Sequence, residues 1–223
     1  MKRLSGIFLA LFLGTAALAQ GRFSVDESLS FGYNRAYGLY EEESTMVGLG
    51  ISDRLDARCG LKLMDGATAM ELGAGYRIAG NFGAEGFATG QWNRKYGLQE
   101  YNIGLLGVWN WRGRVEVKAG TFFKWLSPLD GPGSVLEPFN FAYSLMFWAL
   151  DTEKRFNLGA SLSNLDAFTA ERFYCPLVTV KARYSINRRY QVYALFRQHS
   201  SGTFDLTSNL FDRQFRIGTI IWL

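Results

Sequence analysis

The chain has 223 residues, of which 48% are hydrophobic and 16% aromatic, and its formal net charge at pH 7 is +4. The high apolar content and the scarcity of proline, with only 4 residues, exclude a disordered or collagen-like chain, and two cysteines are too few for a disulfide scaffold. After residue 19 no uncharged apolar run approaches the roughly 20 residues that a membrane-spanning helix requires. The 25 glycines and the many aromatic residues instead favour a chain of many short strands.

Residues 1–19 have the three parts of a secretory signal peptide. A positively charged start, Lys2 and Arg3, precedes a short apolar core, and Ala17-Leu18-Ala19 forms a small-residue cleavage site. A short membrane anchor is the alternative, but the apolar core is too short to span a bilayer. We therefore expect Sec-dependent export, cleavage of the signal peptide, and a single domain over residues 20–223.

The exported part alternates between apolar and polar residues almost from end to end. In the strand expected over residues 22–35, the odd positions from 23 to 33 are apolar, apart from Glu27, and the even positions are polar. A period of two is the direct signal of a strand with one apolar face and one polar face. Similar stretches follow in chain order at residues 47–51, 55–63, 70–78, 82–92, 101–111, 115–125, 139–147, 156–162, 178–186, 190–199 and 215–223.

The connections between these stretches alternate in length. Short turns are expected at residues 52–54, 79–81, 111–113, 151–155 and 187–189. Longer loops are expected at residues 36–45, 94–99, 127–138, 164–171 and 200–209, and the connection at residues 65–66 is a short exception. Short turns on one rim and long loops on the other are typical of a transmembrane β-barrel. The prediction is an all-β, antiparallel up-and-down barrel of about 12 strands, with 10 as an alternative, and with both termini on the short-turn rim.

Alternation alone does not decide which face of the barrel is outside. A soluble, lipocalin-like barrel has the same pattern with its apolar face inward. Three features favour a membrane barrel with its apolar face toward outer-membrane lipid: the signal peptide, a final strand at residues 215–223 that runs to the last residue, and the many charges on the polar face. Tryptophans and tyrosines also gather near the strand ends, where amphipathic rings suit the headgroup region.

On these features the whole chain resembles a small bacterial outer-membrane β-barrel protein. The signal peptide, the alternating strands and the terminal Ile221-Trp222-Leu223 carry the resemblance. Members of this class usually end in an aromatic residue, most often phenylalanine, whereas this chain ends in leucine after tryptophan. The resemblance implies an integral protein of the bacterial outer membrane with a porin-like architecture. It identifies no subfamily and sets no oligomeric state.

The polar face carries more positive than negative charge, and we expect it to line the lumen. Eight cations lie on it, namely Arg58, Lys62, Arg77, Lys118, Lys124, Lys181, Arg183 and Arg216. Five anions oppose them, namely Asp26, Asp56, Glu71, Glu85 and Glu116. A net-positive lumen with low-dielectric walls favours small anionic solutes, which predicts a narrow porin-like channel. The alternative is a structural barrel whose charges pair across the lumen and plug it.

An enzymatic alternative rests on the only histidine. His199 and Ser201 are two residues apart on one strand, so their side chains share a face, and Asp212 is a candidate to orient the histidine. The pattern resembles the His-x-Ser motif of outer-membrane lipid A deacylases, which implies lipid ester hydrolysis, although those enzymes carry asparagine where Gly202 stands. The alternative for His199 is a rim residue that begins a polar loop.

The sequence carries no motif for a metal, a nucleotide cofactor or a nucleic acid. It has no metal-ligand cluster, phosphate-binding loop or dinucleotide fingerprint, so no metal or cofactor is expected. Removing the two basic residues of the signal peptide lowers the net charge from +4 to +2, which is too weak to indicate a nucleic-acid partner.

Overall fold

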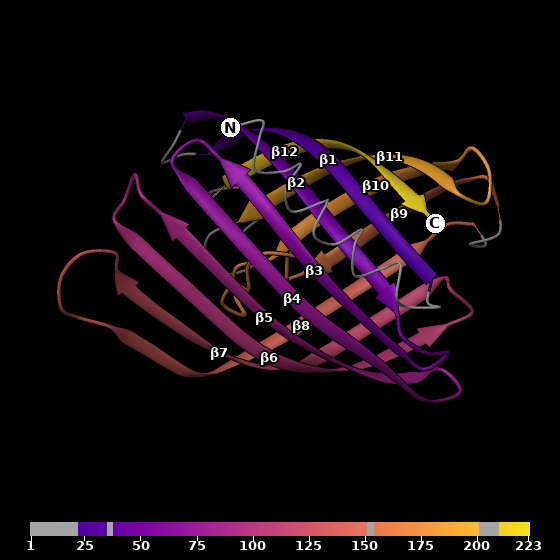
Figure 1. Cartoon of the computed structure of the whole chain (residues 1–223), viewed down its shortest axis with the longest axis horizontal. Helices are drawn as coiled ribbons and strands as arrows, with labels where there is room; N and C mark the ends of the chain where they lie inside the picture. The colour runs from indigo at the N-terminus through magenta and orange to yellow at the C-terminus, as the bar shows by residue number, and fades with distance from the viewer. Residues whose placement is uncertain (1–21, 35–37, 151–153, 201–209) are drawn as a thin grey trace.

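The computed structural model describes residues 22–34, 38–150, 154–200 and 210–223. Over these residues the chain forms twelve antiparallel strands, each paired with its neighbours in sequence, and β1 pairs with β12 to close the barrel (Figure 1). The predicted twelve-stranded barrel is therefore confirmed over the ten-stranded alternative. No helix in the described part of the chain is long and apolar enough to cross a membrane.

The strands differ in length around the barrel. In chain order they are β1 (Arg22–Asn34), β2 (Gly38–Gly50), β3 (Leu55–Met64), β4 (Ala67–Ala79), β5 (Phe82–Asn93), β6 (Leu98–Trp111), β7 (Val115–Pro128), β8 (Val135–Trp148), β9 (Phe156–Ser163), β10 (Leu177–Ser185), β11 (Tyr190–Ser200) and β12 (Leu210–Trp222). Strands β9 and β10 are the shortest of the twelve, with 8 and 9 residues. The barrel wall is therefore lower on this side than at β6 to β8, which have 14 residues each.

The apolar face of the strands points outward. On β6, Ile103 and Leu105 are 63% and 64% exposed, whereas Asn102 and Leu106, which flank them in sequence, are 1% and 2% exposed. The same outward belt of exposed large side chains continues around the barrel through Leu29, Phe31, Leu72, Tyr76, Phe123, Leu145, Phe156, Val180, Phe196 and Ile217. A soluble barrel would bury these groups, and a membrane barrel presents them to lipid. The belt therefore places the barrel in a membrane with the predicted face outward.

Both ends of the described chain lie on the rim of the short turns. The backbone nitrogen of Leu223 donates a hydrogen bond to the carbonyl of Phe23 at 2.9 Å. The signal-peptide prediction for residues 1–19 lies outside the described residues, as does nearly all of the loop predicted at residues 200–209.

The long loop predicted at residues 36–45 is wrong, because β2 already begins at Gly38. Its inward positions, such as Glu42 and Ser44, are buried, and its outward positions include Glu41 and Glu43. These outward glutamates removed the apolar alternation on which the prediction depended. Most of the predicted loop is therefore part of the barrel wall.

The loop predicted at residues 164–171 is also different from the expectation. It extends over residues 164–176 and folds into the barrel, where Asn164, Phe168, Ala170 and Pro176 are almost completely buried. Because β9 and β10 are short, this connection begins below the rim that the taller strands reach. We call residues 164–176 the inserted segment.

Candidate functional site

The inserted segment is tied to the barrel wall where β9 stops pairing with β8. The β8–β9 ladder contains only five residue pairs, from Ser144 to Trp148 on β8. Beyond it, the Asn164 side-chain amide donates to the carbonyls of Phe141 and Glu171, both at 2.8 Å, and its Oδ1 accepts from the backbone nitrogen of Tyr143 at 2.7 Å. One asparagine side chain thus makes two hydrogen bonds to the backbone of β8 where β9 no longer pairs with it, and a third within the inserted segment.

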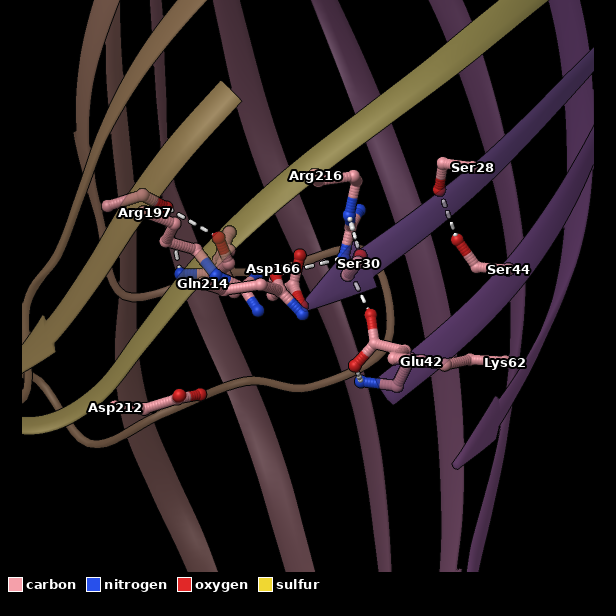
Figure 2. Close-up of polar contacts among 12 residues, drawn as sticks. Ser28, Ser30, Glu42, Ser44, Lys62, Asp166, Arg197, Asp212, Gln214 and Arg216 are labelled. Carbon is pink, nitrogen blue, oxygen red and sulfur yellow. Dashed lines mark hydrogen bonds and ion pairs between the residues drawn. The ribbon is translucent and has the colours of Figure 1, made fainter. Parts of the chain in front are cut away.

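Charged side chains from four strands and the inserted segment meet on the other side of the lumen. Asp166 of the inserted segment pairs with Arg197 of β11 at 2.5 Å. Glu42 of β2 pairs with Arg216 of β12 at 2.8 Å and with Lys62 of β3 at 3.5 Å (Figure 2). These five side chains are between 2% and 12% exposed. We call them the ion-pair layer.

Asp166 lies between strands rather than in one, and its charge is held by the cations around it. Burial alone would raise the pKa of Asp166, but Arg197, Arg216 and Lys62 outweigh burial and hold the pKa well below its usual range. The carboxylate is therefore ionised at neutral pH, and its attraction to Arg197 anchors the inserted segment.

Apolar contacts hold the same segment against β5 to β8. Inward-facing Phe87, Leu106, Phe122 and Ala142 form a buried cluster with Ala170, and Leu165 packs against that cluster. Lys124 donates to the carbonyl of Ala170 at 2.9 Å, and Lys62 lies 5.3 Å from the centre of the Phe168 ring. The inward side chains at this level are buried, so the lumen has no wide aqueous passage there.

A cavity of about 560 Å³ opens on the short-turn side of this level. Its lining includes Asp56, Arg58, Arg77, Glu85, Glu116 and Lys118. Four of these six charges pair with one another: Arg58 with Glu85, and Lys118 with Glu85 at 2.6 Å and with Glu116 at 3.6 Å. Arg58 also pairs with Glu71 at 2.6 Å. We call this space the short-turn cavity; its β3–β7 wall is polar but largely neutralised.

A smaller cavity of about 160 Å³ lies toward the long loops. His199 and Asp212, which are opposite each other in the β11–β12 ladder, both line it. Both oxygens of Asp212 accept a hydrogen bond from the hydroxyl of Tyr40 at 2.9 Å. His199 therefore faces the lumen, whereas the resemblance to lipid A deacylases implies a catalytic face toward lipid. Ser201, the proposed nucleophile, lies outside the described residues.

The structure places the sequence-predicted lumen residues as follows. The short-turn cavity is lined by Asp56, Arg58, Arg77, Glu85, Glu116 and Lys118, and Glu71 pairs with Arg58. The ion-pair layer contains Lys62 and Arg216, and Lys124 pairs with Glu100 at 3.0 Å. Lys181 lies over the ring of Tyr193, and Arg183 lies over the ring of Trp148. Their role in ion selectivity stays a prediction. Among the described residues, no three His, Cys, Asp or Glu side chains are grouped so that they could hold a metal ion.

The sequence analysis missed seven charged residues of the lumen and its two cavities. Arg197 raises the eight predicted cations to nine, and Glu42, Glu100, Asp166 and Asp212 raise the five anions to nine. Arg112 and Glu171, which line the two cavities, add one charge of each sign. Glu42, Glu100, Arg197 and Asp212 lie on strands, so the alternation of inward and outward positions could have found them. Nothing local predicts Asp166, because only the fold brings the inserted segment into the lumen. Among the described residues the positive and negative charges of the lumen balance, so any preference for anions has to arise locally.

A closed barrel of twelve antiparallel strands, apolar outside and charged inside, is the architecture of bacterial outer-membrane β-barrel proteins. Comparison with solved structures finds the same fold. The KdgM porin in complex with disordered oligogalacturonate is 12% identical, with a TM-score of 0.57, over 89% of this chain and 98% of that chain. The NanC porin is 11% identical, with a TM-score of 0.57, over 88% and 100%.

A third similar structure is the translocator domain of the autotransporter NalP from Neisseria meningitidis. It is 14% identical, with a TM-score of 0.52, over 97% of each chain. No protein-family model and no curated protein sequence matches the chain. The fold and the outward apolar belt together place the protein in the bacterial outer membrane.

Proposed function

We propose that the protein is a narrow, porin-like channel for passive movement of small solutes across the outer membrane. The observation that carries the proposal is the lumen itself, in which two polar cavities lie on opposite sides of the ion-pair layer and the inserted segment. In this proposal the inserted segment forms the constriction that limits the size of the solute. The similarity to the KdgM and NanC porins supports the choice of function.

Small anionic solutes are the class that we propose for the cargo. The oligogalacturonate named with the KdgM porin is a chain of sugar acids, and the two barrels are similar in fold. Because the lumen charges of the described residues balance, selectivity in this proposal comes from cations that have no carboxylate partner. The proposal assigns no catalytic role to His199.

Solute uptake by proteoliposomes tests the channel. Full-length protein refolded into liposomes should let a neutral pentose enter slowly and should exclude a tetrasaccharide, which would be seen as osmotic swelling in the first case only. Phe168→Ala removes a ring that is 1% exposed in the inserted segment, so it should speed swelling and admit larger sugars.

Phe173→Ala is the matched control, because Phe173 belongs to the same segment but is 48% exposed and packs on Phe141 and Tyr143 at the outer face. It should leave the swelling rate unchanged. Liposomes that admit no pentose with either wild type or Phe168→Ala would overturn the proposed function.

A further inference from the structure

Among the described residues, four lumen cations have no carboxylate partner: Arg77 and Arg112 at the short-turn cavity, and Lys181 and Arg183. Lys181 and Arg183 lie two residues apart on β10 and therefore share its inward face. By contrast, Arg58, Lys118 and Arg216 each pair with a glutamate. Within the described residues, no carboxylate oxygen lies within ion-pair distance of Lys181 or Arg183, and both cations lie over aromatic rings.

Arg183 is held by an indole ring rather than by an acid. Its guanidinium carbon lies 4.0 Å from the centre of the Trp148 ring. One terminal nitrogen, Nη2, is buried without a hydrogen-bond acceptor, while the side chain as a whole is only half-buried. Stacking on an aromatic face fixes the plane of the guanidinium and leaves its other N–H groups available for a planar oxyanion.

Lys181 is positioned in a similar way. Its Nζ lies 4.2 Å from the centre of the Tyr193 ring, and the Tyr193 hydroxyl donates to Oδ1 of Asp26 at 2.8 Å. Tyr193 lies directly over Gly218, where a Cβ atom would be 2.4 Å from the ring. The Tyr193 ring, over which the Lys181 ammonium lies, is thus packed against the backbone of Gly218, and its hydroxyl is held by Asp26. Two cations face one carboxylate here, so the local charge is positive.

We propose that Lys181 and Arg183 form an oxyanion-binding site for the carboxylate or phosphate group of a small solute. Same-face neighbours on a strand are about 7 Å apart, so a solute bound to the forked N–H groups of Arg183 also feels the ammonium of Lys181. Arg188 and Arg189, in the turn that follows β10, add positive charge at the same rim. The site deepens the proposed channel function, because it gives a passing anion a place to bind beside the constriction.

Calorimetric titration of the full-length protein in detergent at low salt tests the site. The probes are inorganic phosphate and glucuronate, with glucose as the uncharged control. Both anions should bind saturably and glucose should not. Arg183→Gln and Lys181→Gln should each weaken anion binding at least about tenfold, because each removes one charge-assisted contact.

Arg54→Gln removes the same charge from an exposed position in the β2–β3 turn and should leave affinity unchanged. Arg183→Lys keeps the charge but loses the forked geometry, so it should bind with intermediate affinity, and it preserves the test if Arg183→Gln fails to fold. Heat-modified migration in gels checks the fold of every variant.

The site is overturned if wild type binds neither anion saturably, or if Arg54→Gln weakens binding as much as Arg183→Gln does. Such a result leaves the channel function standing, because uptake of neutral sugars by proteoliposomes does not depend on an anion site.

Discussion

Glycines facing tyrosine rings explain part of the unusual glycine content at the level of single residues. A Cβ atom on Gly32 would lie 2.3 Å from the ring of Tyr40, and one on Gly218 would lie 2.4 Å from the ring of Tyr193. Each tyrosine covers the bare backbone of a glycine on the neighbouring strand, as aromatic residues do in other sheets. These glycines serve close packing in the lumen and not turns.

Gly218→Ala should therefore be destabilising by about 1–3 kcal/mol, because the added methyl group forces the Tyr193 ring away from Asp26. Urea unfolding of protein refolded in lipid vesicles measures the change in the free energy of unfolding. Gly86→Ala is the control, since the nearest atom to its Cβ would be 4.0 Å away. Equal losses from the two substitutions would contradict the packing role of Gly218.

The outward face predicts a second single-residue effect. Ile103→Arg places a charge on the lipid face near the middle of β6 and should cost about 2–4 kcal/mol of folding free energy in a bilayer. Ile103→Leu keeps the apolar surface and should be nearly neutral. Folding titrations in vesicles compare the two, and an arginine tolerated as well as leucine would place this face away from lipid.

At the scale of elements, the inserted segment depends on one asparagine. Asn164→Ala removes three hydrogen bonds to backbone groups of β8 and of the segment itself, and should be destabilising by about 1–3 kcal/mol. Amide hydrogen exchange should become faster in residues 164–176 and at Tyr143. Asn140→Ala, which removes a single weaker contact of 3.4 Å to Glu137, should leave exchange there unchanged. Unchanged protection in Asn164→Ala would show that the segment is held by its other contacts alone.

The elements that could be predicted from the sequence are those whose pattern lies within a short stretch of the chain. Strands such as β1 and β4 can be predicted from the alternation of apolar and polar residues, and turns between strands can be predicted from glycine and asparagine. The first half of β2 was not predicted as a strand, because Glu41 and Glu43 point outward and break the apolar pattern. The insertion of residues 164–176 into the lumen was not predicted, because the residues that they contact, Lys124 and Arg197, lie far away in the sequence.

The candidate site also has a part that the sequence predicts and a part that only the fold reveals. Parity alone assigns Arg58, Lys118 and Glu85 to one face, but it does not show that they pair with one another. Nor does it show that Lys181 and Arg183 are left without carboxylates, because that depends on which strands lie opposite. A charge count from one sequence therefore finds the lumen residues more readily than the field that they create.

For the whole molecule, the outward belt predicts a protein that fractionates with the outer membrane. It should also migrate faster in gels before boiling than after, because a closed barrel resists detergent until it is heated. Cells expressing the full chain provide both measurements. Recovery of a soluble periplasmic monomer without detergent would contradict the membrane assignment.

Electrical conductance across a planar lipid bilayer tests the central claim most directly, namely that the barrel is a channel narrowed by its inserted segment. Wild type should give small, discrete conductance steps, and Phe168→Ala should give larger steps because the segment then fills less of the lumen. If neither protein raises conductance above that of the bare bilayer, the barrel is not a channel and the account is contradicted.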